Sequence, residues 1–179
     1  MVKDVLAGLL VILLAAAPAA PAPVDEYAVK VAFLYNFAKF VEWPDSVFAA
    51  HPDTHRFCFY GSDLFAPALL KELEKKAVQG RRVAVLHPTL PQELAACQIV
   101  FLRRGDDARL PEVLSAVGGL PVLLVGEAEG FAQRGGMINF VVEDEHVRFE
   151  INRRTAAVAG LEVSSKLLGL AKVIDRRER

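Results

Sequence analysis

Four short apolar runs, separated by segments of helical pattern, constrain the fold of this chain more than any other feature. The runs are residues 56–60, 82–86, 98–102 and 121–125. Between them the pattern predicts a helix over residues 62–76, a single helical turn near 92–95 and a helix over 107–117. Strands that alternate with helices at this spacing indicate a mainly parallel sheet, and right-handed crossovers place helices on both of its faces.

The pattern changes after residue 125. Residues 137–142 and 146–151 read as two strands joined by an acidic turn, which predicts an antiparallel hairpin at one sheet edge. In the second strand His146, Arg148 and Glu150 share one face, and this face is expected to meet solvent or a partner. Two helices, 153–159 and 164–173, are expected to follow. The predicted class is therefore α/β, with a mainly parallel central sheet flanked by helices and a C-terminal antiparallel hairpin at one edge.

A helix over residues 25–41 has an apolar surface wider than packing on one core requires. One face carries Tyr27, Val31, Leu34, Ala38 and Val41, and the adjacent face carries Phe33, Phe37 and Phe40. Only Lys30 interrupts them. Two interpretations remain open. Either neighbours bury this helix from two sides, or the row of phenylalanines docks another protein.

The beginning of the chain resembles an export signal. Lys3 precedes an apolar run over residues 5–17, and an Ala/Pro segment with small-residue cleavage sites follows. The run is shorter than the ~20 residues that span a bilayer, which makes a retained anchor the weaker alternative. We expect residues 1–23 to be removed, residues 24–179 to form one domain, and the mature protein not to insert into the membrane. The balance of 21 Lys+Arg against 22 Asp+Glu argues against a nucleic-acid binder.

The chain has two cysteines, Cys58 and Cys97, both at strand-like positions. In an exported protein an even count favours a disulfide, and two free buried thiols are the alternative. Zinc is not indicated, since neither cysteine belongs to a C-x-x-C pair.

Motifs for catalysis are missing from the sequence. The glycine-rich segments at 118–119, 126–130 and 134–136 lack the spacing of a phosphate-binding loop and are interpreted as turns, with Gly135 and Gly136 expected to supply positive φ. No nucleophile motif occurs. His51, Asp53 and His55 are interpreted as a solvated polar loop, not a metal site. We therefore expect neither an enzyme, nor a cofactor, nor a bound metal.

Ordered blocks over the whole mature domain resemble the YfiR family. The blocks are residues 32–44, 80–81, 130–132, 135–140, 148–152 and 164–168. The resemblance implies a periplasmic repressor that binds the periplasmic region of an inner-membrane diguanylate cyclase and keeps cyclic-di-GMP synthesis off, which limits biofilm formation. It also implies a cysteine pair that matches Cys58 and Cys97. A second pair near the hairpin, present in the family's type protein, is absent here.

Residues and resemblance together suggest a homodimer that docks on a membrane signalling enzyme and stabilises its inactive state. The residues expected to bind the partner are Phe33, Phe37, Phe40, Arg148 and Glu150. The rival hypothesis is a periplasmic sensing module for an amino acid or cell-wall fragment that serves another membrane signalling protein or a transporter. Its pocket would lie between the first helix and the hairpin and be lined by Trp43, Asn139, Arg148, Glu150, Asn152 and Lys166.

Overall fold

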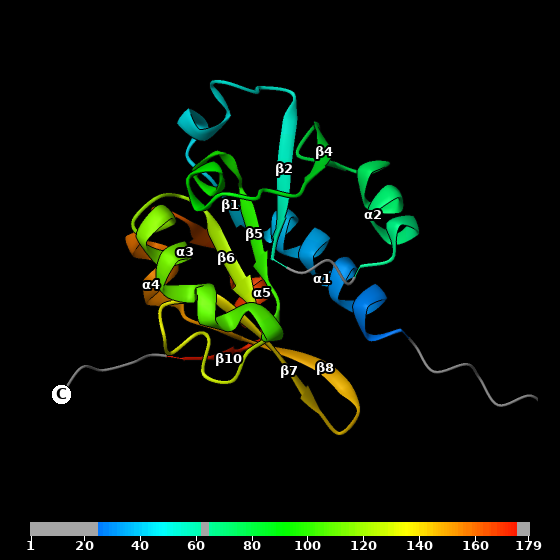
Figure 1. Ribbon diagram of the computed structural model, residues 1–179, viewed down its shortest axis with the longest axis vertical. Coiled ribbons are helices and arrows are strands. Elements are labelled where there is room, and N and C mark those ends of the chain that lie inside the picture. The colour runs from blue at the N-terminus through cyan, green and yellow to red at the C-terminus, as the bar shows by residue number, and fades with distance from the viewer. Residues whose placement is uncertain (1–24, 62–64, 175–179) are drawn as a thin grey trace, which may run out of the picture.

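The computed structural model describes residues 25–61 and 65–174. The predicted export signal lies outside the described residues. An eight-stranded sheet of order β10-β8-β7-β6-β5-β2-β4-β3 forms the centre of the domain (Figure 1). Its strands are β2 (Thr54–Tyr60), β3 (Ala77–Val78), β4 (Arg81–Leu86), β5 (Ile99–Leu102), β6 (Leu123–Gly126), β7 (Ile138–Glu143), β8 (His146–Ile151) and β10 (Lys172–Val173). Five neighbouring strands run parallel, in the order β7-β6-β5-β2-β4. Strand β8 runs antiparallel to β7 and forms the expected hairpin with it. The predicted fold class is confirmed.

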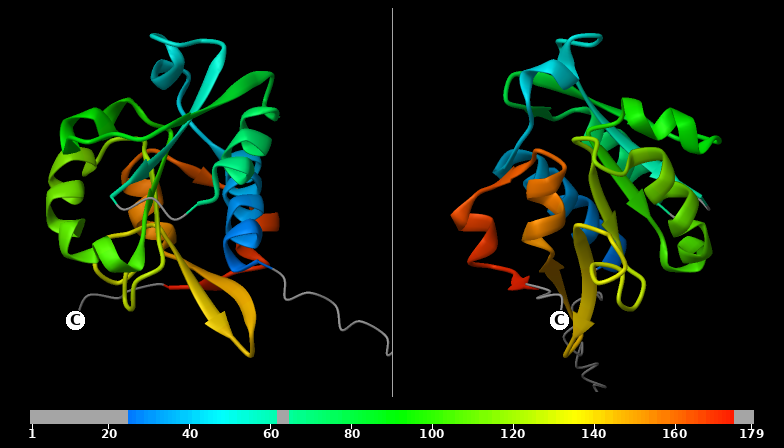
Figure 2. Two further views of the ribbon diagram at one scale, coloured as in Figure 1. Left: turned by 45° about the vertical axis from the view of Figure 1, so that its right-hand side comes forward. Right: turned by 90° about the vertical axis from the view of Figure 1, so that its left-hand side faces the viewer.

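Helices cover both faces of the sheet. The α-helices are α1 (Glu26–Phe40), α2 (Pro67–Glu74), α3 (Leu110–Val117), α4 (Arg153–Val158) and α5 (Ser165–Leu168). Three 3-10 helices, η1 (Asp45–Phe48), η2 (Pro91–Ala96) and η3 (Arg104–Arg109), connect other elements. A separate two-stranded antiparallel sheet pairs β1 (Val41–Glu42) with β9 (Glu162–Val163). Figure 2 shows α1 and α3 on opposite sides of the central sheet.

Two hydrophobic cores result from this layering. The larger core packs α1, α2 and α5 against the sheet face that carries Phe57, Ile99 and Val125. The smaller core packs α3 and η2 against the opposite face, which carries Val100 and Leu124. Because both faces are covered, the central strands are buried on both sides, and this is why they read as continuous apolar runs in the sequence.

The last part of the chain differs from the expected helix over residues 164–173. Helix α5 has four residues and ends at Gly169, and the chain then forms β10. Glycine weakens helix propagation, because it loses the most backbone freedom on ordering. Strand β10 pairs in parallel with β8 and places Lys172 beside Glu150. The hairpin is therefore covered on its outer side by one further short strand.

Cys58 and Cys97 form the expected disulfide, with a Cα–Cα distance of 6.0 Å. The bond joins β2 to the residue after η2, and both cysteines are buried in the smaller core. It therefore links the centre of the sheet to the layer that covers it.

The loop after β6 packs tightly because two glycines admit the ring of Phe131. A Cβ atom at Gly126 would lie 2.4 Å from this ring, and one at Gly136 would lie 2.2 Å from it. Gly135 has the positive φ expected for this turn, at 112°, whereas Gly136 does not, so the expectation for Gly136 is wrong. The glycines thus hold the loop against the end of the sheet, where the charged residues described below are found.

Candidate functional site

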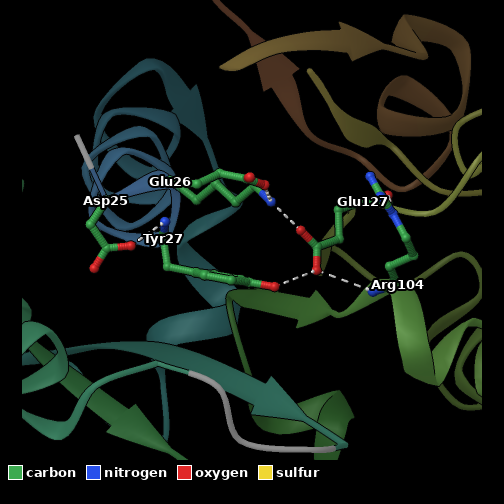
Figure 3. A network of polar contacts seen from close by, with 6 residues as sticks. Asp25, Glu26, Tyr27, Arg104 and Glu127 are labelled. Atoms are coloured by element: carbon green, nitrogen blue, oxygen red, sulfur yellow. Dashed lines mark hydrogen bonds and ion pairs between the residues drawn. The ribbon is translucent and has the colours of Figure 1, made fainter. Parts of the chain in front are cut away.

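A buried polar network lies where β5 and β6 end, between the sheet and α1 (Figure 3). Glu127 directly follows β6 and is only 3% exposed, and Lys30 of α1 is 1% exposed. The Lys30 ammonium donates to Oε2 of Glu127 and to Oε1 of Glu26. The Tyr27 hydroxyl and the Arg104 backbone N–H donate to Oε1 of Glu127, at 3.3 and 3.2 Å. Both oxygens of Glu127 are therefore occupied.

The pKa shifts in this network follow from burial and charge. Burial alone would lower the pKa of Lys30, but the hydrogen bonds from its ammonium to Glu127 and Glu26 outweigh this effect and raise that pKa. Burial and the neighbouring negative charge of Glu127 raise the pKa of Tyr27. At neutral pH the lysine is thus charged and the tyrosine is protonated. The network holds α1 against the sheet and leaves no free base or nucleophile among these residues.

Metal binding has no candidate cluster in the described part of the chain. Within residues 25–61 and 65–174, no group of three or more His, Cys, Asp or Glu side chains is arranged to hold a metal ion.

A groove runs between α1 and the β7–β8 hairpin, and we call it the α1–hairpin groove. It has a volume of about 740 Å³ and is lined by Glu26, Val29, Phe33, Val142, Glu145, His146 and Val147. Val142 is 47% exposed. Four of these side chains are apolar, and the other three, Glu26, Glu145 and His146, are exposed and charged or polar. This composition suits contact with another protein.

The three phenylalanines predicted to bind a partner differ in their exposure. Phe33 is part-exposed in the groove, and its ring lies 5.3 Å from that of Phe149. Phe40 is also part-exposed, but it does not line this groove. Phe37 is fully buried between the rings of Phe140 and Phe149, at 5.5 and 5.0 Å. The expectation for Phe37 is therefore wrong, because the hairpin already covers its side chain.

The predicted charged face of β8 is divided in the same way. Arg148 is exposed and stays a candidate for partner binding. Glu150 is only 7% exposed, because β10 runs beside it and Lys172 pairs with its carboxylate at 3.2 Å. The expectation that Glu150 lies on an open face is wrong.

The predicted ligand pocket is not assembled as one cavity. Asn139 lines a hollow beside the loop after β6, whereas Asn152 lines a different, mainly apolar hollow between α3 and α4. Asn152 also caps α4 by accepting from the backbone N–H of Thr155. Lys166 belongs to α5, and Trp43 packs in the larger core, with its ring 4.8 Å from that of His55. These residues do not share one pocket within the described structure.

His55 corrects the interpretation of residues 51–55 as a solvated loop. It belongs to β2, and the rings of Trp43, Phe48 and Phe57 surround its fully buried imidazole at 4.8, 5.7 and 5.4 Å. Neither ring nitrogen has a hydrogen-bond partner among the described residues. Burial and the nearby charge of Arg81 lower the pKa of His55 from its ordinary value of 6.5 to about 4. The imidazole is therefore neutral at physiological pH.

The buried network was missed at the sequence level. Lys30 was visible as the single charge on an apolar helix surface, a position at which a lysine is buried only if it is paired. Glu127 was hidden in a glycine-rich segment interpreted as a turn. The isolated position of Lys30 suggests a buried acidic partner, but the sequence offers no means of choosing Glu127 among the acidic residues.

The family model described as YfiR/HmsC-like matches residues 27–172, which is nearly all of the described structure. The chain belongs to the YfiR/HmsC-like family. This family is periplasmic and regulatory rather than catalytic, and it works with membrane signalling proteins. Membership suggests a periplasmic regulator in diguanylate cyclase signalling.

No curated protein matches this YfiR/HmsC-like chain. Among solved structures, it is similar to the ABC domain in complex with L-Trp from Streptococcus pneumonia, with a TM-score of 0.50 and 14% identity. The similarity covers 78% of this chain and 61% of that one, so the YfiR/HmsC-like chain spans about three fifths of the solved chain's length. At this identity the likeness concerns the fold alone. Among the described helices, none combines the length and apolar character needed to cross a membrane.

Proposed function

We propose that this protein is exported to the periplasm, binds the periplasmic part of an inner-membrane diguanylate cyclase as a homodimer, and represses cyclic-di-GMP synthesis. The observation that carries the proposal is the α1–hairpin groove. It contains apolar side chains that the domain leaves partly uncovered, and its lining also includes the charged Glu26 and Glu145. Family membership supplies the class of partner.

Phe33 is suited to be an anchor in this groove. Its ring is held by Phe149, Phe37 and Phe140 at 5.3, 6.0 and 6.1 Å, so its position is fixed before a partner arrives. Preorganised aromatic anchors contribute much of the free energy of binding, because little side-chain entropy is lost on contact. A partner that inserts an apolar side chain beside Phe33 and Val142 would remove both from water.

Repression requires that the domain bind the inactive cyclase more tightly than the active one. To change the inactive fraction from about 1% to 99%, the two affinities must differ by ~5.5 kcal/mol. The groove alone need not supply this difference. Exposed Arg148 on the same hairpin offers a further, charged contact.

The test uses cyclic-di-GMP levels in cells. Deletion of the gene should raise cyclic-di-GMP, and the wild-type gene should restore the low level. Val142→Asp should fail to restore it, because a carboxylate in the groove opposes apolar contact. Leu120→Asp is the matched control, since Leu120 is also a part-exposed apolar residue but does not line the groove.

Purified proteins complete the test. Both variants alter exposed side chains, so both should fold normally. Val142→Asp should co-purify with at least about tenfold less membrane cyclase than Leu120→Asp, which corresponds to ~1.4 kcal/mol. Phe33→Ser, checked for folding by circular dichroism, should show the same loss. Unchanged cyclic-di-GMP after deletion, or equal capture by all variants, would refute the proposal. Sedimentation of the wild-type protein tests the homodimer.

A further inference from the structure

The β7–β8 hairpin projects beyond the rest of the central sheet and leaves part of β7 without a neighbour (Figure 1). Strand β6 ends at Gly126 and pairs with β7 only at Ile138 and Asn139. Strand β7 continues from Phe140 to Glu143, and over this stretch β8 is the only strand of the described residues that pairs with it. One edge of β7 is therefore open there.

The register of the hairpin shows which main-chain groups point toward this edge. The two turn residues, 144–145, have φ of 49° and 62°, and the turn closes on the pair Glu143 and His146. A two-residue turn is closed by a hydrogen-bonded pair, and the two kinds of pair then alternate along the strands. Val142 pairs with Val147 at a non-hydrogen-bonded position. The N–H and C=O of Val142 therefore point away from β8 and toward the open edge.

A contact on the other edge of the hairpin agrees with this alternation. Ile151 also lies at a non-hydrogen-bonded position of the hairpin, and its C=O points outward and accepts from the N–H of Ile174 at 2.8 Å. The corresponding groups of Val142 have no such partner, since no hydrogen bond within the described residues reaches its N–H or C=O. The main chain of Val142 is thus unpaired on the side of β6.

A hollow of about 710 Å³ lies against this edge and is lined by β7 from Asn139 to Val142. The charged residues that line it from η3 and the loop after β6 are Arg104, Asp107, Glu127, Glu129 and Arg134. Arg134 pairs with Asp107, and Glu127 pairs with Lys30, which leaves one charge of each sign. Charge therefore selects no ion here, and the unpaired main chain is the feature that selects an occupant.

The opposite edge of the central sheet is protected. Strand β3 pairs with the beginning of β4, and farther along β4 the Glu74 carboxylate accepts from the N–H of Val85 at 3.4 Å. Natural proteins cover strand edges in such ways, because an open edge recruits other strands. An edge that stays open beside a hollow is suited to strand addition, in which main-chain hydrogen bonds hold an extended segment of a partner.

We propose that an extended segment of the membrane cyclase adds to the open edge of β7 as a further strand. This inference rests on the docking proposed above and specifies how the partner is held. The segment pairs with Val142 through main-chain hydrogen bonds and continues the line of β6 into the hollow. Val142 also lines the α1–hairpin groove, so the edge and the groove form one continuous surface. This continuity favours the same partner over a second copy of the chain.

Amide hydrogen exchange, measured by NMR on the free protein, tests whether the edge is open. The N–H of Val142 should exchange at least about a hundredfold faster than that of Val141, which pairs with Arg148 at a hydrogen-bonded position. Equal protection of the two amides would mean that the edge is already covered, and it would overturn the proposal.

The same measurement on the complex with the purified periplasmic region of the cyclase locates the added strand. Exchange at Val142 should slow at least about tenfold more than exchange at Val147, the equivalent outward position on β8. Slowing at Val147 and not at Val142 would place the partner on the other edge. Slowing at Val142 in a concentrated solution of this protein alone would identify a second copy as the occupant. Either result overturns the proposal.

Two proline variants separate main-chain binding from side-chain binding. Val142→Pro removes the outward N–H and keeps an apolar side chain, and proline is tolerated at an edge where its N–H would not serve the ladder. It should lower capture of the cyclase at least about fivefold, a loss typical of a hydrogen bond. Val147→Pro makes the same change on the other edge, is the matched control and should capture normally. Melting temperatures check that both variants fold, and the exchange measurements stand without them.

The docking and the strand addition can fail separately. Val142→Asp keeps the N–H and changes the side chain, so it tests the groove. If Val142→Asp loses capture while Val142→Pro captures normally and exchange at Val142 is unchanged in the complex, the strand addition is refuted and the docking stands. If none of these variants alters capture, the docking itself is refuted, and the strand addition with it.

Discussion

His55 should make the folded domain less stable as the pH falls, and His55→Phe should remove this effect. The imidazole lies in a cage of Trp43, Phe48 and Phe57, and its pKa is lowered to about 4 by burial and by Arg81. In the unfolded chain the pKa returns to its ordinary value of 6.5. Between these two values the unfolded chain binds a proton that the folded chain does not, so acidification favours unfolding.

The magnitude follows from the two pKa values. At about pH 7.5 the histidine is neutral in both states and contributes almost nothing to the pH dependence. At about pH 4.5 the unfolded chain is almost fully protonated at this site and the folded chain is not, which lowers the free energy of unfolding by ~2.5 kcal/mol. The effect begins below pH 6.5 and is complete below pH 4. A phenylalanine fills the aromatic cage without a titrating group.

Urea unfolding of both proteins at several pH values, followed by tryptophan fluorescence, measures the effect. Carboxylates also titrate in this range, but they contribute equally to both proteins. The difference between the two free energies of unfolding should therefore change by ~2.5 kcal/mol from pH 7.5 to 4.5. Parallel pH profiles would refute the reasoning, since they would mean that the buried histidine is protonated at no extra cost. An absolute stability change at neutral pH would not affect this comparison.

Two further predictions concern the links between layers. Reduction of the Cys58–Cys97 bond, or replacement of both cysteines by alanine, should lower the free energy of unfolding by ~4 kcal/mol for a loop of 39 residues, and urea unfolding with and without reductant measures it. An unchanged unfolding midpoint would contradict this value. Glu127→Ala should cost about 3 kcal/mol, because it removes the buried partner of Lys30 and leaves its buried charge paired only with the half-exposed carboxylate of Glu26. The double variant Lys30→Met/Glu127→Leu should recover most of this loss, because it removes both buried charges. A cycle of the single and double variants measures the free energies of unfolding, and a double variant as unstable as Glu127→Ala would contradict the prediction.

The sequence was informative about the central strands because of their burial. Residues 56–60 and 82–86 were predicted, and β2 and β4 extend over Thr54–Tyr60 and Arg81–Leu86. A strand covered on both faces must be apolar along its whole length, and this leaves a signal that one sequence shows. Strands of two residues, such as β3 and β10, carry no such periodicity and were missed.

The candidate site was less predictable, since it depends on contacts between distant segments. Lys30 and Glu127 are separated by 97 positions, and only the topology of the sheet brings them together. Glu150 alternates with apolar residues exactly as an exposed residue would, but the neighbouring strand β10 covers it. Phe37 illustrates the same limit, because the wheel of α1 cannot show which of its faces the hairpin occupies. Local pattern determines an element, whereas burial depends on what packs against it.

The free end of β7 has a mechanical consequence. Val142 lines both the α1–hairpin groove and a second hollow that Arg104, Glu127 and Arg134 also line, so the β7–β8 ribbon borders both hollows. An occupant of either hollow would contact the same backbone, and within the described residues no third strand pairs with this ribbon on the β6 side beyond Asn139. The ribbon is thus joined to β6 at one end only, and molecules bound on its two sides would both bias the position of its free end.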